Sequence, residues 1–282
     1  RTAHPMHMLR TMVSALGMFD KDADANSVEA NRAKSIKLLA KTPTIIANFD
    51  RHRKGKPFVA PDATLSMAAN FLWMLNGAKP TEAVAKALDV CLILHADHGL
   101  NASTFAGRVT ISTLSDLYSA IVTAIGTLKG PLHGGAPGPV LDMLDAIGEA
   151  SRAEAWFDDA FAKGTNLMGF GHRIYKVRDP RADVLKAIVA SLPETAGRLA
   201  YAGEVEKGAI AALRKHKPGR RLDTNVEYYT ALLLEALEIP REAFTALFAV
   251  GRVAGWCAHV FEQVEGGRII RPQSNYIGPR PN

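Results

Sequence analysis

The sequence predicts an almost entirely helical fold. Apolar residues recur at helical spacing along most of the chain, and no convincing run of alternating apolar and polar residues is present. Aromatic residues make up only 7% of the chain, which disfavours a β-sandwich. With 282 residues, 48% of them hydrophobic, the chain has enough apolar material for a packed core, and global disorder is excluded.

The helical segments are expected between capping residues and helix breakers. Ser27 is a candidate N-cap, and Pro43 is expected to open a separate helix because proline suits the first turn. Asp62 is expected to cap the following helix, which Gly77 ends. In chain order, the segments expected to be helical are 4–16, 27–39, 43–49, 62–76, 80–95, 115–128, 140–147, 182–192, 204–213, 226–237 and 243–261.

The distribution of glycine and proline predicts two domains. The stretch from Gly134 to Glu238 is richer in loops, begins with a run of glycine and proline, and ends before Pro240. We therefore expect residues 135–238 to form a small domain inserted into a large domain of residues 1–134 and 239–282, with glycines as hinges.

Charge and cysteine content exclude several classes of protein. The net charge is +6 and the isoelectric point is about 9.3, which fits nucleic acid, anionic lipid or a small polyanionic substrate. The basic runs at 51–56 and 214–221 are interpreted as solvated loops. Two cysteines exclude a disulfide scaffold and a four-cysteine zinc site.

No secretory signal is visible at the start of the chain. The longest apolar stretch, 244–261, nearly has the length of a membrane span but contains Arg252 and His259. Because an arginine near the centre of a membrane helix is costly, we interpret this stretch as a buried helix with one functional cation. The protein is predicted to be cytoplasmic, with no membrane partner.

Histidines occur in three unusual contexts. His95 and His98 lie three residues apart at a helix end, where they could ligate a metal, bind an anion or cap the last turn. No third ligand is obvious, so no metal is predicted. His133 lies among glycines, where a ligand can approach the bare backbone, although an ordinary turn explains it equally well. His172 lies in a loop rich in arginine and lysine that suits a phosphate or carboxylate.

Two further charged residues are candidates for chemistry. Glu227 follows Asn225 at a helix start, where a carboxylate either interacts with the helix dipole or acts as a general base. Arg252 lies in an apolar helix and needs an anionic partner from the protein or from a ligand.

Together these motifs closely resemble the citrate synthase family, which includes 2-methylcitrate synthases. The motifs occur in the family's order: His95-Ala-Asp-His98, Gly-Pro-Leu-His133-Gly-Gly, Gly-Phe-Gly-His172-Arg with Asp-Pro-Arg181, Asn-Val-Glu227, Phe-Ala-Val-Gly-Arg252 and Ile-Arg271-Pro. The resemblance runs from about His4 to the C-terminus. It implies a large and a small helical domain that close over a cleft, and a homodimer. Family chains usually carry additional N-terminal helices, so the large domain is expected to be incomplete in this chain, which begins with Arg1.

The resemblance also implies a role for individual residues. His133 would stabilise the enolate of acetyl-CoA, His172 would polarise the oxaloacetate ketone, and Glu227 would take the methyl proton. The oxaloacetate carboxylates would be bound by His98, Arg181, Arg252 and, from the neighbouring subunit, Arg271. Coenzyme A would contact Lys176, Gly169 and Gly171. No tightly bound cofactor is implied.

The main departure from the family is Glu227, where relatives usually have aspartate. The longer side chain changes the reach of the carboxylate by roughly 1.5 Å, which can cost about a hundredfold in rate unless the backbone compensates. Three alternatives stand beside citrate synthesis: use of propionyl-CoA to make 2-methylcitrate, an inactive paralogue that binds coenzyme A or oxaloacetate, and, resting only on the isoelectric point, nucleic-acid binding.

Overall fold

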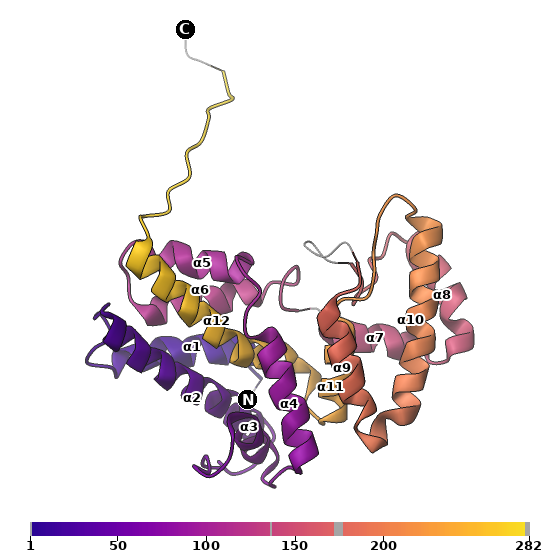
Figure 1. The fold of residues 1–282 in the computed structure, drawn as a ribbon, viewed down its shortest axis with the longest axis horizontal. Coiled ribbons are helices and arrows are strands. Elements are labelled where there is room, and N and C mark those ends of the chain that lie inside the picture. Colours follow the sequence, from indigo (N-terminus) through magenta and orange to yellow (C-terminus); the bar gives the residue numbers. More distant parts are fainter. Residues whose placement is uncertain (1, 136, 172–176, 280–282) are drawn as a thin grey trace.

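The computed structural model describes residues 2–135, 137–171 and 177–279, and this part of the chain is helical (Figure 1). No strand forms within it, and one isolated antiparallel bridge pairs Phe170 with Thr224. The α-helices are α1 (Pro5–Met18), α2 (Val28–Arg53), α3 (Met67–Asn76), α4 (Glu82–His95), α5 (Ala102–Ile111), α6 (Leu117–Leu128), α7 (Pro137–Ile147), α8 (Ala153–Ala162), α9 (Pro180–Ala190), α10 (Ala196–His216), α11 (Val226–Ala236) and α12 (Phe244–Gly266). Short 3-10 helices are η1 (Ala150–Arg152), η2 (Pro193–Thr195) and η3 (Arg241–Ala243).

The predicted all-α class is confirmed, but the prediction that Pro43 opens a separate helix is wrong. Pro43 is buried inside the continuous helix α2. The hydroxyls of Thr42 and Thr44 donate to the carbonyl oxygens of Leu38 and Ala40. Packing of α2 against α1, α3 and α12 therefore overrides the local preference of proline to begin a helix.

Two helices and one cap differ from the prediction as well. Helices α5 and α8 were not expected. The N-cap of α3 is Ser66, whose side chain accepts from the Ala69 N–H, and not Asp62. Asp62 instead accepts from the Thr64 N–H in the preceding turn.

Helix α12 is the central element of one group of helices. It packs against α2, α4, α5 and α6, while α7 to α11 lie together on the other side of the molecule (Figure 1). By length and composition α12 is the one candidate for a membrane span in the described part of the chain, yet 67% of its apolar window is buried inside the fold. Contacts of α4 with α9 and α11 join the two groups. The domain boundaries expected at 134/135 and 238/239 stay a prediction.

The segment after α12 leaves the body of the molecule. Figure 1 shows its described part, up to residue 279, as an extended trace that leads away from the helices. Its first part is tied by a hydrogen bond from the Ile270 N–H to the Ser112 hydroxyl, and Arg271, the next residue, is exposed.

Candidate active site

The end of α4 and the loop that follows lie directly against α12. The Gly255 N–H donates to the Ala96 carbonyl over 3.1 Å. A Cβ atom at Gly255 would lie 2.2 Å from that carbonyl oxygen, and one at Gly251 would lie 2.9 Å from the Leu92 carbonyl oxygen. These two glycines therefore let the backbones approach closely, and the approach brings Arg252 under the end of α4.

Arg252 is a buried cation that forms no ion pair with the described residues. Its side chain is 2% exposed, its Nε donates to the His95 carbonyl over 2.7 Å, and its guanidinium lies over the Phe248 ring. Burial lowers the pKa of Arg252 to about 10, so it remains charged at neutral pH. Within residues 2–135, 137–171 and 177–279, no carboxylate lies within ion-pair distance of it. A buried guanidinium in this state is suited to bind an anionic ligand.

His133 lies in the turn after α6 and is held in one tautomer. The Ser103 N–H donates to its Nε2 over 3.2 Å, and the Ser103 hydroxyl lies 2.8 Å from the same atom. Because Nε2 accepts a backbone proton, the neutral ring carries its own proton on Nδ1. Burial, assisted by the charge of Arg252, lowers the pKa of His133 to about 4. The ring is therefore a neutral hydrogen-bond donor at physiological pH.

Glu227 is a desolvated carboxyl group at the start of α11. Its N–H donates to the side chain of the N-cap Asn225, and its Oε2 is buried without a hydrogen-bond partner. Burial raises the pKa of Glu227; the charges of Arg181 and Arg252 oppose this rise. A carboxylate with a raised pKa and a vacant oxygen is suited to accept a proton.

Asp179 holds Arg181 beside Glu227. Asp179 is fully buried and caps α9 by accepting from the Arg181 N–H. Its two oxygens also accept from Nε and Nη2 of Arg181 over 3.0 and 2.7 Å, and the Val226 N–H lies 3.3 Å from one of them. One carboxylate thus joins the start of α9 to the start of α11 and fixes an arginine at their junction.

The two histidines at the end of α4 have different surroundings. His95 is buried, with Nδ1 2.7 Å from the Cys91 carbonyl oxygen and Nε2 3.3 Å from the Thr230 hydroxyl, so both nitrogens have partners in the core. His98 is half-buried in the loop after α4. No group of three His, Cys, Asp or Glu side chains that could hold a metal ion occurs among the residues described.

Gly169 and Gly171 have a conformational role that sequence reasoning did not give them. Both have positive φ angles, +83° and +81°. A Cβ atom at Gly169 would lie 2.9 Å from the Tyr228 ring, and one at Gly171 would lie 2.8 Å from Leu222. The Asn225 N–H donates to the Gly169 carbonyl, so these glycines also hold the start of α11. The predicted residues His172 and Lys176 lie outside the described residues.

Comparison with known proteins identifies the family. The sequence model of the family described as citrate synthase, C-terminal domain, matches residues 1–273. The chain belongs to the citrate synthase family. A citrate synthase of Haloferax volcanii is 45% identical over 280 residues, covering 98% of this chain and 73% of that protein. A 2-methylcitrate synthase of Mycobacterium tuberculosis is 39% identical over 277 residues, covering 98% of this chain and 68% of that protein.

The fold agrees with this membership. A citrate synthase from Thermoplasma acidophilum, solved as a ternary complex with carboxymethyl coenzyme A and oxaloacetate, matches with a TM-score of 0.90 at 35% identity. The match covers 99% of this chain and 74% of that one. As a member of the citrate synthase family, the chain is an enzyme that transfers an acyl group.

Sequence reasoning missed several residues that position the site of this citrate synthase family member. Ser103 on α5 contacts His133, and Trp256 Nε1 on α12 donates to the Ser103 hydroxyl over 3.1 Å. Asp179, the N-cap of α9, holds Arg181 on the same helix. Asp179 could have been found from its place directly before Pro180, a helix-start pattern. The contacts of Ser103 and Trp256 leave no comparable local signal.

Proposed function

We propose that this chain condenses acetyl-CoA with oxaloacetate and hydrolyses the resulting citryl-CoA to citrate and coenzyme A. The observation that carries the proposal is a set of three incomplete groups. Among the described residues, His133 has no partner on Nδ1, Glu227 has a buried carboxylate oxygen without a hydrogen bond, and Arg252 has no counter-ion. A proton donor, a base and an anion-binding cation are what this condensation requires.

Oxaloacetate is a dianion, so several cationic groups must converge on it. Arg252 and Arg181 bind its carboxylates, and His98 contributes from the loop after α4. The burial of Arg252 strengthens its attraction for an anion, because little water competes for the guanidinium. Arg271 on the extended tail reaches the site of a neighbouring subunit in a homodimer.

Enolate formation needs a base and an acceptor of the developing charge. Glu227 removes a proton from the methyl carbon of the thioester, and its raised pKa makes it a stronger base than an exposed carboxylate. The Nδ1–H of His133 donates to the thioester oxygen, where negative charge develops. Because the ring is neutral, it stabilises the enolate as a hydrogen-bond donor.

The enolate carbon then attacks the ketone carbon of oxaloacetate, and His172 protonates the new alkoxide. Water hydrolyses the thioester of citryl-CoA and releases coenzyme A. Lys176 with Gly169 and Gly171 contacts coenzyme A. Closure of residues 135–238 over residues 1–134 and 239–282 excludes water while the enolate exists.

A specific observation favours one second candidate, 2-methylcitrate synthesis from propionyl-CoA: the 39% identical relative carries that name. One methylene in an acyl pocket changes discrimination by only about 1–3 kcal/mol. A catalytically inactive member that binds coenzyme A or oxaloacetate is the third candidate, because Glu227 departs from the usual aspartate. A cytoplasmic location and the absence of nucleic-acid and membrane partners belong to the same proposal.

The first test measures release of free thiol from acetyl-CoA and from propionyl-CoA, each with oxaloacetate. We expect turnover by the wild type, and a loss of about 10²- to 10⁴-fold in kcat for His133→Ala because the enolate loses its hydrogen-bond donor. His52→Ala, which removes an exposed histidine on α2, is the matched control and should retain the wild-type rate.

Three outcomes would change the proposal. Full turnover by a folded His133→Ala protein would overturn the role of this histidine. A preference for propionyl-CoA would replace citrate synthesis by 2-methylcitrate synthesis. Tight binding of oxaloacetate without thiol release from either substrate would favour the inactive member.

A further inference from the structure

A single face of α12 holds the loop that carries His98. Arg252, Gly255 and His259 are spaced three and four residues apart, so they lie along one side of the helix. Their partners follow one another in the loop: the His95 carbonyl, the Ala96 carbonyl and the Asp97 carboxylate. The outermost of these three contacts, between His259 and Asp97, is made by side chains alone.

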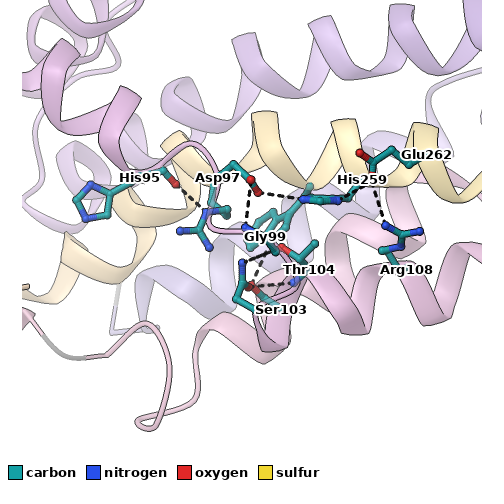
Figure 2. A network of polar contacts seen from close by, with 11 residues as sticks. His95, Asp97, Gly99, Ser103, Thr104, Arg108, His259 and Glu262 are labelled. Carbon is teal, nitrogen blue, oxygen red and sulfur yellow. Dashed lines mark hydrogen bonds and ion pairs between the residues drawn. The ribbon is translucent and has the colours of Figure 1, made fainter. Parts of the chain in front are cut away.

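Asp97 uses both of its carboxylate oxygens to fix this loop. Figure 2 shows the carboxylate between the loop and α12. Oδ1 lies 3.1 Å from Nε2 of His259, and Oδ2 accepts from the Gly99 N–H over 3.1 Å. The second contact closes a turn around His98, and Gly99 has a left-handed φ of +57°. The carboxylate thus determines the shape of the turn and its distance from α12.

His259 is in turn held between two carboxylates. Its Nδ1 lies 2.8 Å from Oε2 of Glu262, and this oxygen also accepts from Nη1 of Arg108 over 3.0 Å. The network runs from Asp97 through His259 and Glu262 to Arg108 (Figure 2).

Arg108 connects this network to the element that orients His133. It lies on α5, and its Nε donates to the side chain of Gln263 on α12 over 3.0 Å. The first turn of α5 contains Ser103, whose N–H donates to His133. The same polar network thus ties α12 to both segments that the proposed function uses, the turn around His98 and helix α5.

We propose that Asp97 and His259 are positioning residues that fix His98 for oxaloacetate binding. This inference rests on the proposed function. Much of this loop is exposed, with Asp97, Gly99 and Leu100 open to solvent, so it has few packing contacts to hold it. The pair of hydrogen bonds on Asp97 supplies that constraint, and its loss lets His98 move away from the substrate carboxylate.

The test compares Asp97→Ala, His259→Ala and the double variant with the wild type in steady-state kinetics. We expect KM for oxaloacetate to rise about tenfold in each single variant, with kcat and KM for acetyl-CoA changed less than about threefold. Because the two residues act through one contact, the double variant should be no worse than the more affected single variant. Asp97→Asn, which can still accept from the Gly99 N–H, should recover part of the affinity.

His216→Ala is the matched control, because His216 forms a similar contact, 2.6 Å from Asp158, on another part of the surface. It should keep both KM values. Equal increases in the two KM values, additive effects in the double variant, or an unchanged KM for oxaloacetate would overturn the inference. If the wild type releases no thiol, the proposed function fails. Calorimetric titration of oxaloacetate into the wild type, the two single variants and the double variant still decides the inference. Weaker binding in the variants than in the wild type supports it, and equal binding in all four proteins, or no binding by the wild type, overturns it.

Discussion

Two buried carboxyl groups on neighbouring helices of this protein have opposite surroundings. Glu206 lies on α10 and is 4% exposed, and Glu227 lies on α11 with its Oε2 buried. Glu206 accepts from Nη1 of Arg178 over 2.6 Å, from the Thr224 hydroxyl over 2.6 Å and from the Tyr229 hydroxyl over 2.5 Å. Burial opposes its ionisation, but these hydrogen bonds outweigh burial and lower the pKa of Glu206.

Glu227 lacks such a set of partners. Its Oε2 accepts no hydrogen bond, and burial raises the pKa of Glu227. Helix α11 presents Tyr229 to the complete group around Glu206 and, two residues earlier, Glu227 to the incomplete site. The comparison teaches that burial alone does not distinguish a structural charge from a functional one; whether the protein itself satisfies the charge does.

The largest effect we expect is the loss of activity when Glu227, the carboxyl group without hydrogen-bond partners on Oε2, is replaced. Glu227→Gln removes the base while keeping the size of the side chain, so thiol release should fall about 10²- to 10⁴-fold. Its melting temperature should not fall, because the variant no longer buries an unpartnered carboxylate. Glu227→Asp shortens the reach of the carboxylate by roughly 1.5 Å and should lower the rate of thiol release by up to about a hundredfold.

Thiol-release kinetics and thermal unfolding of the same preparations check these expectations. A Glu227→Gln protein with the wild-type rate would remove the distinction between the two carboxyl groups. A Glu227→Asp protein faster than the wild type would show that the backbone does not compensate for the longer side chain.

The next effect is a loss of stability when Glu206, the carboxyl group with a full set of hydrogen bonds, is replaced. Glu206→Gln leaves Arg178 without its buried partner, so the free energy of unfolding should fall by about 3 kcal/mol. The folded protein should keep a rate much closer to the wild type than Glu227→Gln does. Glu204→Gln, which breaks an exposed pair with Lys207 on the same helix, is the matched control and should cost less than about 1 kcal/mol. Urea unfolding measures both; equal losses in the two variants would contradict the structural role of Glu206.

Much of the fold and several candidate residues could be predicted because their signals are local. Helical spacing of apolar residues gave most of the helices, and short motifs around His133, Glu227 and Arg252 gave the candidate site. Arg252 in particular could be predicted from the conflict between one cation and an apolar helix. The family resemblance was carried by the same short motifs and is confirmed by the comparisons.

What could not be predicted depends on contacts between distant segments. The tautomer of His133 is set by Ser103, thirty residues away, and the surroundings of Asp97 are set by His259, 162 residues away. The path of α2 through Pro43 depends on packing against three other helices. Periodicity and capping rules describe only neighbours in the chain, so they contain no information on these pairs.

His95 and His133 can be compared in the same terms. Burial lowers the pKa of both His95 and His133 to about 4, but both nitrogens of His95 have partners within the core. Between pH 6.5 and pH 4 the unfolded chain binds a proton at His95 that the folded chain does not, so stability is fully present above pH 6.5 and falls as the pH decreases. Lowering the pKa of His95 from 6.5 to about 4 corresponds to about 3 kcal/mol in the free energy of unfolding.

Urea unfolding from pH 7.5 to pH 4.5 tests this expectation. His95→Gln should lose stability at neutral pH, because the core loses a fitted ring, yet its stability should fall less steeply with decreasing pH than that of the wild type. His52→Gln, an exposed control, should keep the wild-type slope. An unchanged slope in His95→Gln would mean that this histidine is protonated in the folded protein. His95 would then be a buried cation without a counter-ion among the described residues, like Arg252, although both of its nitrogens have hydrogen-bond partners.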